Sequence, residues 1–217
     1  MTTLIIARHG NTFGPEDTPT RVGARTDIPL VDKGIKQAQA IGRYLKDHNL
    51  LPDAVYSATL KRTQQTAEHA LKAAALSLPV YTMDIFNEID YGIDENQTEE
   101  TVIKRIGKDA ITQWDKNAIV PDGWRADPDD IIQGWRGFAR QISKTQSPET
   151  NQATDLDETI LVVTSNGIAR FAPHITDDFD SFAKKHTIKL STGALGILTF
   201  SQGKWRVADW NIVPLLV

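Results

Sequence analysis

The sequence predicts an α/β fold, a three-layer αβα sandwich with a mostly parallel central sheet. Two runs of residues, 4–7 (LIIA) and 160–163 (ILVV), are apolar throughout, which is typical of parallel strands that are buried on both faces. Segments with the apolar spacing of helices lie between the predicted strands. Both runs end abruptly in polar residues, and open α/β sheets bind ligands beyond the carboxyl ends of their strands. The sequence therefore predicts a ligand site at that edge of the sheet.

Length, charge and composition narrow the class of protein. A chain of 217 residues suits one domain, residues 1–217, rather than two full-sized ones. The formal charge of -4 gives no basic surplus for binding nucleic acid, so we expect a small ligand. The absence of cysteine excludes disulfides, thiolate nucleophiles and cysteine-rich metal sites, and it suits a cytoplasmic location. No stretch approaches the roughly 20 apolar residues that cross a bilayer, so we expect no membrane partner.

The first third of the chain predicts strand, loop, helix, strand and helix in that order. Residues 11–29 are rich in Gly, Pro, Thr and Asp and predict a long functional loop. Apolar spacing over residues 35–45 predicts a helix with Asp32 as its cap. Residues 54–56 predict a short strand, with a turn near Ser57 and then a second helix.

The remainder predicts one more edge strand, three more helices, a buried strand and a hairpin. Residues 79–92 (PVYTMDIFNEIDYG) predict an edge strand that runs into a loop. Helices are expected over about 98–116 and 131–144, and another after the strand at 160–163. Residues 143–158 are polar and predict a mobile surface loop. The last two strands, GALGILTF and WRVADWN, are joined by SQGK as a hairpin turn.

Polar residues that could do chemistry follow three of the predicted strands. Arg8 and His9 come after the first strand, Arg62 lies just beyond the second, and Ser165 and Asn166 follow the strand at 160–163. Two arginines and a histidine at one end of a sheet suit an oxyanion, because guanidinium groups donate forked hydrogen bonds to phosphate oxygens. A phosphate ester is therefore the expected guest. Its cleavage needs a nucleophile and a proton for the leaving group, which His9 and Glu88 could supply.

The motifs around these residues resemble the histidine phosphatase superfamily, also called the phosphoglycerate mutase-like family. ARHGNT (residues 7–12) matches the family signature, and residues 22–45 are similar to its segment of the first helix. VYSATLKRTQQTAE is similar to the family block Ser-x-x-x-Arg-x-x-x-Thr-Ala, offset by one residue at the arginine. NEIDYG resembles its Glu-hydrophobic-Asp-x-Gly block, and DWN its closing strand. The resemblance covers nearly the whole chain.

The resemblance implies a phosphoglycerate mutase-like fold and a phosphohistidine mechanism. His9 would attack phosphorus, Arg8 and Arg62 would hold the oxygens, and Glu88 would protonate the leaving group and later activate water. It implies a cofactor-independent phosphomonoester hydrolase acting on a small phosphorylated metabolite, with no metal and no organic cofactor. The sequence does not indicate an oligomeric state. Further phosphate-binding residues implied or expected are Asn11, Thr12, Ser165 and Asn166.

The sequence departs from the family pattern where a second histidine is usual. The family's fourth strand normally ends in Ser-His-Gly or a near variant, whereas residues 162–170 here are VVTSNGIAR. Counting back from Arg170 without a gap puts Ser165 at the histidine position, and a shift of one residue puts Asn166 there. Neither side chain can carry positive charge. Four other histidines fall elsewhere in the pattern and are expected at the surface rather than as ligands: His48, His69, His174 and His186.

Each candidate residue also has a structural interpretation. His9 could be a buried structural histidine, Arg62 a surface residue of its helix, and Glu88 a solvated loop carboxylate. The Ser165 hydroxyl could bond to the backbone instead of to phosphate. Three tryptophans are expected to fill the core rather than to line a substrate lid: Trp114, Trp124 and Trp135.

Two alternatives to a phosphatase remain open at the level of function. The missing second histidine favours a catalytically weak or inactive relative that binds a phosphorylated ligand or protein as a sensor or scaffold. The retention of Arg8, His9, Arg62 and Glu88 favours an enzyme, because a binding module needs no acid beside a nucleophile. A phosphoglycerate mutase is the weaker alternative, because the glycine-glycine-glutamate-serine stretch of many family members is replaced here by DGWRADPDD.

Overall fold

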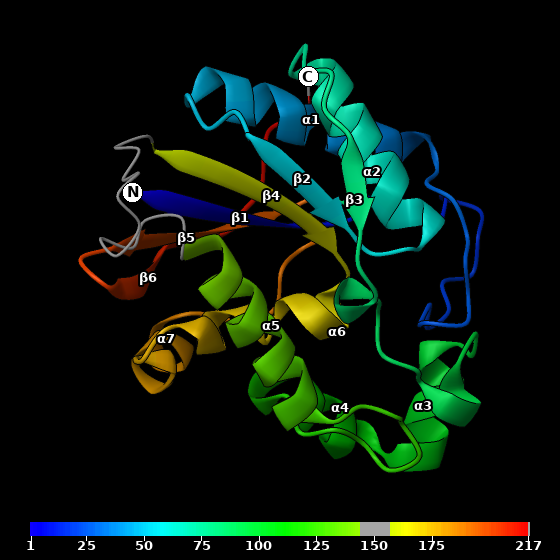
Figure 1. Cartoon of the computed structure of the whole chain (residues 1–217). Coiled ribbons are helices and arrows are strands. Elements are labelled where there is room, and N and C mark those ends of the chain that lie inside the picture. The colour runs from blue at the N-terminus through cyan, green and yellow to red at the C-terminus, as the bar shows by residue number, and fades with distance from the viewer. Residues whose placement is uncertain (144–156, 217) are drawn as a thin grey trace.

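The computed structural model describes residues 1–143 and 157–216. These residues form one six-stranded sheet in the order β3-β2-β4-β1-β5-β6 (Figure 1). The strands β3, β2, β4 and β1 run parallel, and β5 and β6 are antiparallel to their neighbours. The mostly parallel sheet predicted from the sequence is therefore confirmed. The strands are β1 (Thr2–Arg8), β2 (Ala54–Ser57), β3 (Val80–Thr82), β4 (Glu158–Thr164), β5 (Leu195–Ser201) and β6 (Lys204–Ile212).

Two separate apolar clusters lie on the two faces of this sheet, between the strands and the helices that form the outer layers. Along β1, Ile5 and Ala7 belong to one cluster and Leu4 and Ile6 to the other, as expected where successive side chains point to opposite faces. All four are fully buried, which explains why the run shows no polar alternation. The helices α1 (Asp32–Asp47) and α2 (Lys61–Ala73) cover the first face, and they lie together on one side of the sheet in Figure 1.

The opposite face carries the larger, aromatic-rich cluster. α5 (Pro128–Ser143) contributes Trp135 and Phe138 to it, and Trp114 and Trp124 are buried in the same cluster. The prediction that the tryptophans fill the core is confirmed for Trp124 and Trp135, whereas Trp114 belongs to the core cluster and also lines the cavity at the ends of β1 and β4. The remaining elements on this side are η1 (Asp84–Phe86), η2 (Gly92–Asp94), α3 (Glu99–Ile106), α4 (Lys108–Asn117), α6 (Asn166–Ala169), η4 (Ala172–Ile175) and α7 (Phe179–Lys185).

Two local predictions about helices are wrong. The single helix expected over residues 98–116 is two helices, α3 and α4, which are separated by Gly107 at φ 84° and ψ 155°. That conformation is open almost only to glycine, so the chain turns there despite the continuous apolar spacing. Asp32 does not cap α1; it lies in the first turn, and Val31 is the N-cap residue without a side-chain capping bond.

The other predicted elements are found, with small shifts at their ends. The helix expected from residue 131 begins at Pro128, and proline is favoured at the first position of a helix. The side chain of the preceding Asp127 accepts hydrogen bonds from the backbone amides of Asp129 and Asp130. The hairpin between β5 and β6 turns at Gln202 and Gly203, both at positive φ, as in a type I′ turn. The polar loop expected over 143–158 lies, from 144 to 156, outside the described residues.

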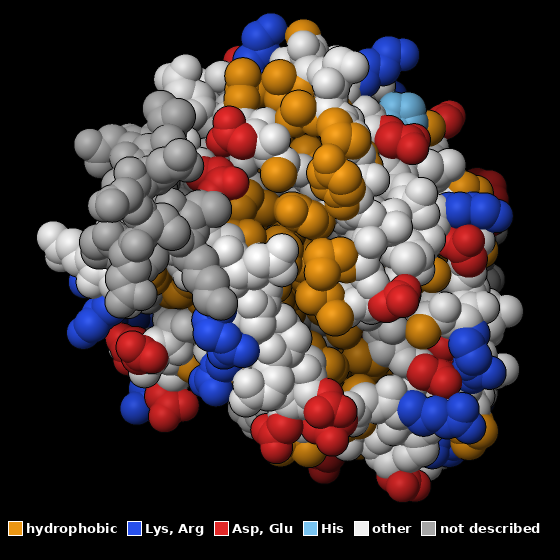
Figure 2. All heavy atoms as spheres, in the orientation of Figure 1, with side chains coloured by type: hydrophobic (Ala, Val, Ile, Leu, Met, Phe, Trp, Pro, Cys, Tyr) orange, Lys and Arg blue, Asp and Glu red, His pale blue; other side chains and the backbone are white. Residues whose placement is uncertain are grey.

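One outer edge of the sheet carries exposed apolar side chains. Figure 2 shows a band of hydrophobic side chains over the region where β3 lies in Figure 1. β3 is the last strand on its side, and its Tyr81 is 53% exposed. Tyr81 contacts Tyr56, which contacts Phe138 in turn, so the band continues the aromatic cluster to the surface. None of the described helices is long and apolar enough to span a membrane.

Candidate active site

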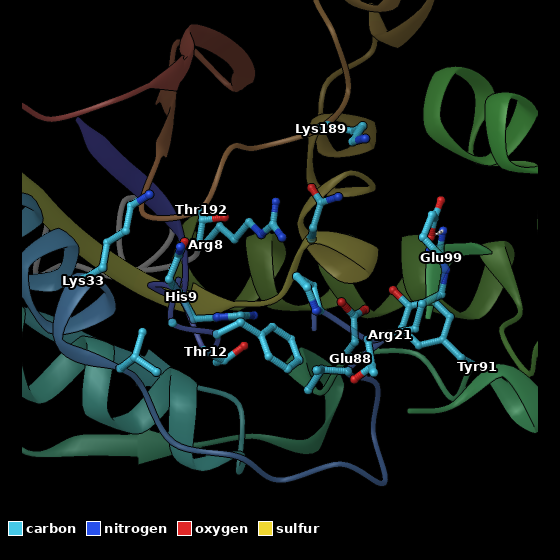
Figure 3. Close-up of a pocket in the computed structure, with 18 of the residues that line it drawn as sticks. Arg8, His9, Thr12, Arg21, Lys33, Glu88, Tyr91, Glu99, Lys189 and Thr192 are labelled. Carbon is cyan, nitrogen blue, oxygen red and sulfur yellow. Dashed lines mark hydrogen bonds and ion pairs between the residues drawn. The ribbon is translucent and has the colours of Figure 1, made fainter. Parts of the chain in front are cut away.

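The ends of β1 and β4 bring the predicted site residues together. The two strands are paired in parallel, with Arg8 opposite Thr164, and the His9 amide donates to the Thr164 carbonyl at 3.0 Å. Residues that follow the two strands therefore share one edge of the sheet. An open cavity of about 1100 Å³ lies there. Of the predicted site residues, it is lined by Arg8, His9, Asn11, Thr12, Glu88 and Asn166 (Figure 3).

His9 is buried and held in one tautomer. Its Nδ1 lies 2.7 Å from the Gly10 carbonyl oxygen, which can only accept, so Nδ1 carries the proton. The lone pair is then on Nε2. Burial lowers the pKa of His9 well below its usual 6.5, and the charges of Arg62 and Arg8 lower it further. His9 is therefore a neutral imidazole near neutral pH, with a free nitrogen that can act as a nucleophile.

Arg8 and Arg62 bring positive charge to His9, and neither is paired with a carboxylate within residues 1–143 and 157–216. Arg8 donates from Nη1 to the Leu190 carbonyl at 2.8 Å. Arg62 is fully buried, so its interpretation as a surface helix residue is wrong. It does not line the cavity, and it donates to carbonyls of the 11–29 loop, from Nη1 to Thr26 at 2.8 Å and from Nη2 to Gly23 at 3.1 Å. The Nε groups of both arginines have no partner in the described part of the chain.

The contacts of Gly10 and Thr66 explain why a glycine follows His9 and why a threonine lies one helical turn after Arg62. Thr66, one helical turn after Arg62, donates to the Arg62 carbonyl at 2.7 Å and accepts from the Gly10 amide at 3.1 Å. A Cβ on Gly10 would lie 2.3 Å from the carbonyl oxygen of Gly34. The loop after β1 thus fits against the start of α1 only with glycine, and Thr66 fixes that loop to α2.

Glu88 lies in the same cavity and is held by backbone amides. Only 6% of the residue is exposed, so its interpretation as a solvated loop carboxylate is wrong. Oε1 accepts from the Ile89 amide at 2.9 Å and Oε2 from the Gly167 amide at 3.1 Å. A Cβ on Gly167 would lie 2.0 Å from Oε1. The glycine after the β4 strand end therefore leaves the space in which the carboxylate sits.

The two candidates for the second-histidine position differ in where they face. Ser165 is fully buried and does not line the cavity, and its Oγ has no hydrogen-bond partner among residues 1–143 and 157–216. The backbone hydrogen bond considered for it is therefore not formed. Asn166 lines the cavity, and its Oδ1 accepts from the Leu190 amide at 3.0 Å. This bond uses the amide oxygen and leaves the Nδ2 group of Asn166 as the donor it can offer to a ligand.

Several cavity residues were not among the candidates taken from the sequence. Tyr91 lines the cavity, and burial raises the pKa of its phenol above the usual value of 10.0, so it remains a neutral donor. Arg170 also lines it and is only 1% exposed. The signal for Arg170 was a lone charge in the apolar stretch GIARFA. The rim carries two ion pairs, Arg21 with Glu99 at 2.6 Å and Lys189 with Asp115 at 2.8 Å.

The positive charges around the cavity floor favour an anionic ligand. In the described chain Arg8, Arg62 and Arg170 form no ion pair with a carboxylate, and the Glu88 oxygens accept from backbone amides. Unpaired buried cations are costly, so a bound anion stabilises this arrangement. The other histidines do not line this cavity, and residues 1–143 and 157–216 hold no group of three or more His, Cys, Asp or Glu side chains arranged for a metal ion.

Figure 3 shows how the labelled residues are distributed around the cavity. Lys33, Arg8 and His9 lie toward one end of this view, and Tyr91, Arg21 and Glu99 toward the other. Glu88 lies between His9 and Tyr91. A guest that reached from His9 past Glu88 would therefore extend toward polar and charged side chains.

Comparison with known proteins agrees with this geometry. The family described as "Histidine phosphatase superfamily (branch 1)" matches residues 4–213. The uncharacterized phosphatase PhoE of Bacillus subtilis is 28% identical over 214 residues, which are 98% of this chain and 95% of that protein. The fold resembles a phosphoglycerate mutase from Bacillus anthracis (TM-score 0.75, 22% identity, 98% and 93% of the two chains). It also resembles a mycobacterial glucosyl-3-phosphoglycerate phosphatase (TM-score 0.73, 18% identity, 97% and 98%). The chain therefore belongs to the histidine phosphatase superfamily, with the phosphoglycerate mutase-like fold.

Proposed function

We propose that this protein is a cofactor-independent phosphomonoester hydrolase that acts on a small phosphorylated metabolite through a phosphohistidine at His9. The observation that carries the proposal is the state of His9: a neutral imidazole with its lone pair on Nε2, at the floor of an open cavity. The guanidinium groups of Arg8 and Arg62, whose charges act on it, form no ion pair with a carboxylate among the described residues. A bound anion would stabilise such a site, and the Nε2 nucleophile would lie close to that anion.

The first half-reaction transfers the phosphoryl group to His9. Nε2 attacks phosphorus, the bond from phosphorus to the ester oxygen breaks, and Glu88 gives its proton to the leaving alcohol. The Nδ1 proton stays on the ring and is held by the Gly10 carbonyl, which keeps Nε2 directed at phosphorus. Arg8, which lines the cavity, offsets the charge on the non-bridging oxygens, as phosphoryl transfer requires. Arg62 is buried and does not line the cavity, so it adds positive charge without direct contact.

The second half-reaction releases phosphate. Water attacks phosphorus while the Glu88 carboxylate takes its proton, the bond from phosphorus to nitrogen breaks, and neutral His9 returns. Asn11, Thr12 and Asn166 lie around the same cavity and are proposed to donate to the phosphoryl oxygens. Ser165, buried behind them, would reach phosphate only after a local rearrangement, so Asn166 is the better candidate for the place of the second histidine.

Two observations favour hydrolysis over mutase chemistry. The cavity is open and large enough to admit water beside a bound ester. PhoE of Bacillus subtilis, which aligns over nearly the full length of both chains, is described as an uncharacterized phosphatase, whereas the similarity to the Bacillus anthracis phosphoglycerate mutase, at 22% identity, concerns the fold alone. A mutase must keep water away from its phosphoenzyme while it holds a second phosphorylated molecule.

Turnover of para-nitrophenyl phosphate between about pH 5 and 8 tests the proposal. His9→Ala is expected to lower kcat by at least about 10³-fold, because His9 is the only histidine of the described residues that lines the cavity. His69→Ala, on α2 and away from the cavity, is the matched control and is expected to keep wild-type turnover. Residual activity above a few per cent in His9→Ala would contradict the phosphohistidine. A wild-type protein that binds orthovanadate but shows no turnover would replace the hydrolase with the sensor.

A further inference from the structure

The carboxylate of Glu95 joins the 11–29 loop to the segment that carries Glu88, although it does not line the cavity. Its Oε2 accepts from the Tyr91 amide at 3.2 Å. Its Oε1 accepts from three donors of the loop: the Gly23 amide at 3.1 Å, the Arg25 amide at 3.0 Å and the Thr26 hydroxyl at 2.8 Å. One side chain therefore accepts four hydrogen bonds from two segments that are far apart in the sequence.

The loop packs directly on the backbone of this segment. The Ala24 amide donates to the Ile89 carbonyl at 3.0 Å. A Cβ on Gly23 would lie 2.2 Å from the Glu95 Oε2 and 2.7 Å from the Ile89 carbonyl oxygen. Only a glycine leaves room for the carboxylate at this place, so the path of the loop depends on the contact between Gly23 and Glu95.

The same part of the loop holds the guanidinium group of Arg62. Nη1 donates to the Thr26 carbonyl at 2.8 Å, and Nη2 donates to the Gly23 carbonyl at 3.1 Å and the Val22 carbonyl at 3.4 Å. Gly23 and Thr26 thus each donate to Glu95 and accept from Arg62. Two single residues connect the carboxylate to the guanidinium, and neither connection passes through the cavity.

The position of Arg62 matters because its charge acts on the proposed nucleophile. Burial lowers the pKa of His9, and the charge of Arg62 lowers it further, ahead of that of Arg8. Arg62 has no ion pair with a carboxylate in the part of the chain that the structure describes. The loop carbonyls are the acceptors that fix its guanidinium, so a change in the loop would move this charge.

We infer that Glu95 is a positioning residue, whose carboxylate fixes residues 22–26 in the conformation that holds the Arg62 guanidinium in place. Glu95 acts through Arg62 and takes no part in bond making. The inference rests on the proposed function, because it treats His9 as the nucleophile that the Arg62 charge keeps neutral. The alternative is a purely structural carboxylate, which would stabilise the fold without affecting the charge at His9.

Glu95→Gln tests this role, because glutamine keeps the shape but places an NH₂ group where one oxygen accepts hydrogen bonds. We expect kcat/KM for para-nitrophenyl phosphate to fall by about 10–100-fold, as small displacements at a site can cause. We also expect the pKa of His9 to rise, measured by NMR titration of the ¹³C-labelled histidines and assigned with His9→Ala. Loss of the negative charge alone would lower this pKa, so a rise reports the displacement of Arg62.

Two further variants accompany Glu95→Gln. Thr26→Val removes one hydroxyl donor and keeps the carboxylate, so both quantities are expected to change in the same direction but less. It also decides the matter by the same titration if Glu95→Gln fails to fold. Glu100→Gln, in the first turn of α3 with a side chain that is 77% exposed, is the matched control and is expected to keep both wild-type values.

A double-mutant cycle with Arg62→Lys shows whether Glu95 acts through Arg62. Lysine keeps the charge but cannot hold three carbonyls in the geometry of a guanidinium, so adding Glu95→Gln is expected to change kcat/KM by less than about twofold. Equal losses in both backgrounds, or an unchanged His9 pKa with a lowered melting temperature, would overturn the inference. The titration needs no turnover. If the wild type hydrolyses nothing, a raised His9 pKa in Glu95→Gln still supports the positioning role, and only the hydrolase fails.

Discussion

His9 shows how the surroundings of one side chain set its chemistry. An exposed imidazole has a pKa near 6.5 and is partly protonated at neutral pH. Burial and two adjacent guanidinium groups shift the pKa of His9 down, and the Gly10 carbonyl selects the tautomer. A cationic site thus prepares its own neutral nucleophile, because the charges that attract phosphate also keep the imidazole unprotonated.

Glu88→Gln separates acid catalysis from phosphate binding. The amide keeps the shape of the side chain but cannot deliver a proton to the leaving oxygen. We expect kcat to fall by about 10²–10⁴-fold for alkyl phosphates, the range typical of general acids, and by much less for para-nitrophenyl phosphate, whose leaving oxygen is a weak base. Steady-state kinetics over a series of leaving groups measures the difference. Glu68→Gln on the exposed side of α2 is the control, and equal losses for alkyl and aryl esters would remove Glu88 from the acid role.

The sequence located the candidate residues better than it located their surroundings. Arg8 and His9 could be chosen because they lie in a compact motif at the end of β1, and Glu88 because it lies in a compact motif of the loop after β3. The structure places all three around one cavity. Arg170 and Tyr91 could not be chosen with the same rules. Their position depends on how α4, α6 and the loop after β3 meet, and single-sequence patterns carry no record of such contacts between distant segments.

At the scale of elements, the short helix α6 is packed against Glu88 with no space to spare. Gly167→Ala would put a methyl group where Oε1 now lies, so Glu88 must move. We expect a loss of about 10–100-fold in kcat for alkyl phosphates, since a displacement near 1 Å can cost that much. Gly137→Ala on α5, where a Cβ meets only an arginine side chain at 3.8 Å, is the matched control. It is expected to keep activity and to raise the free energy of unfolding by about 0.5–1 kcal/mol. Wild-type kinetics in Gly167→Ala would show that the carboxylate position is not critical.

The break between α3 and α4 shows a limit of helical periodicity. Apolar spacing continues through residues 98–116, and only Gly107 at φ 84° interrupts the backbone. A Cβ at Gly107 would meet nothing within 4 Å, so any cost of a side chain there comes from the backbone alone. Gly107→Ala is expected to lower the free energy of unfolding by about 1–3 kcal/mol, the cost of holding a non-glycine residue in that region. Urea denaturation measures it, and an increase in stability would mean that α3 and α4 can join into one helix.

The architecture of the whole molecule could be predicted from the two apolar runs, whereas the shape of the cavity could not. The runs became β1 and β4, which pair although about 150 residues separate them in the chain. Fully apolar strands require cover on both faces, so the three layers could be expected. The residues that line the cavity come from many segments between Arg8 and Thr192. The shape of the cavity therefore depends on the conformations of several loops, which the lengths of those loops do not determine.

Stability of the whole molecule is expected to fall in mild acid. Burial lowers the pKa of His174 to about 4 and that of His9 well below 6.5. Below the unfolded pKa near 6.5 the unfolded chain therefore binds more protons than the folded one, so the free energy of unfolding decreases as the pH falls. One such histidine contributes at most about 1.4 kcal/mol per pH unit, and a partly solvated site such as that of His174 contributes less.

His174→Asn isolates this contribution, because the ring stacks on Phe179 and its side chain lies outside the proposed site. The variant is expected to lose some stability at pH 7 through the lost ring contact, and to show a shallower decline than wild type between about pH 6.5 and 4. Chemical denaturation at a series of pH values gives the two slopes. His48→Asn, at the exposed end of α1, is the control for a surface histidine. A slope in His174→Asn as steep as that of wild type would assign the acid sensitivity to His9 and the carboxylates instead.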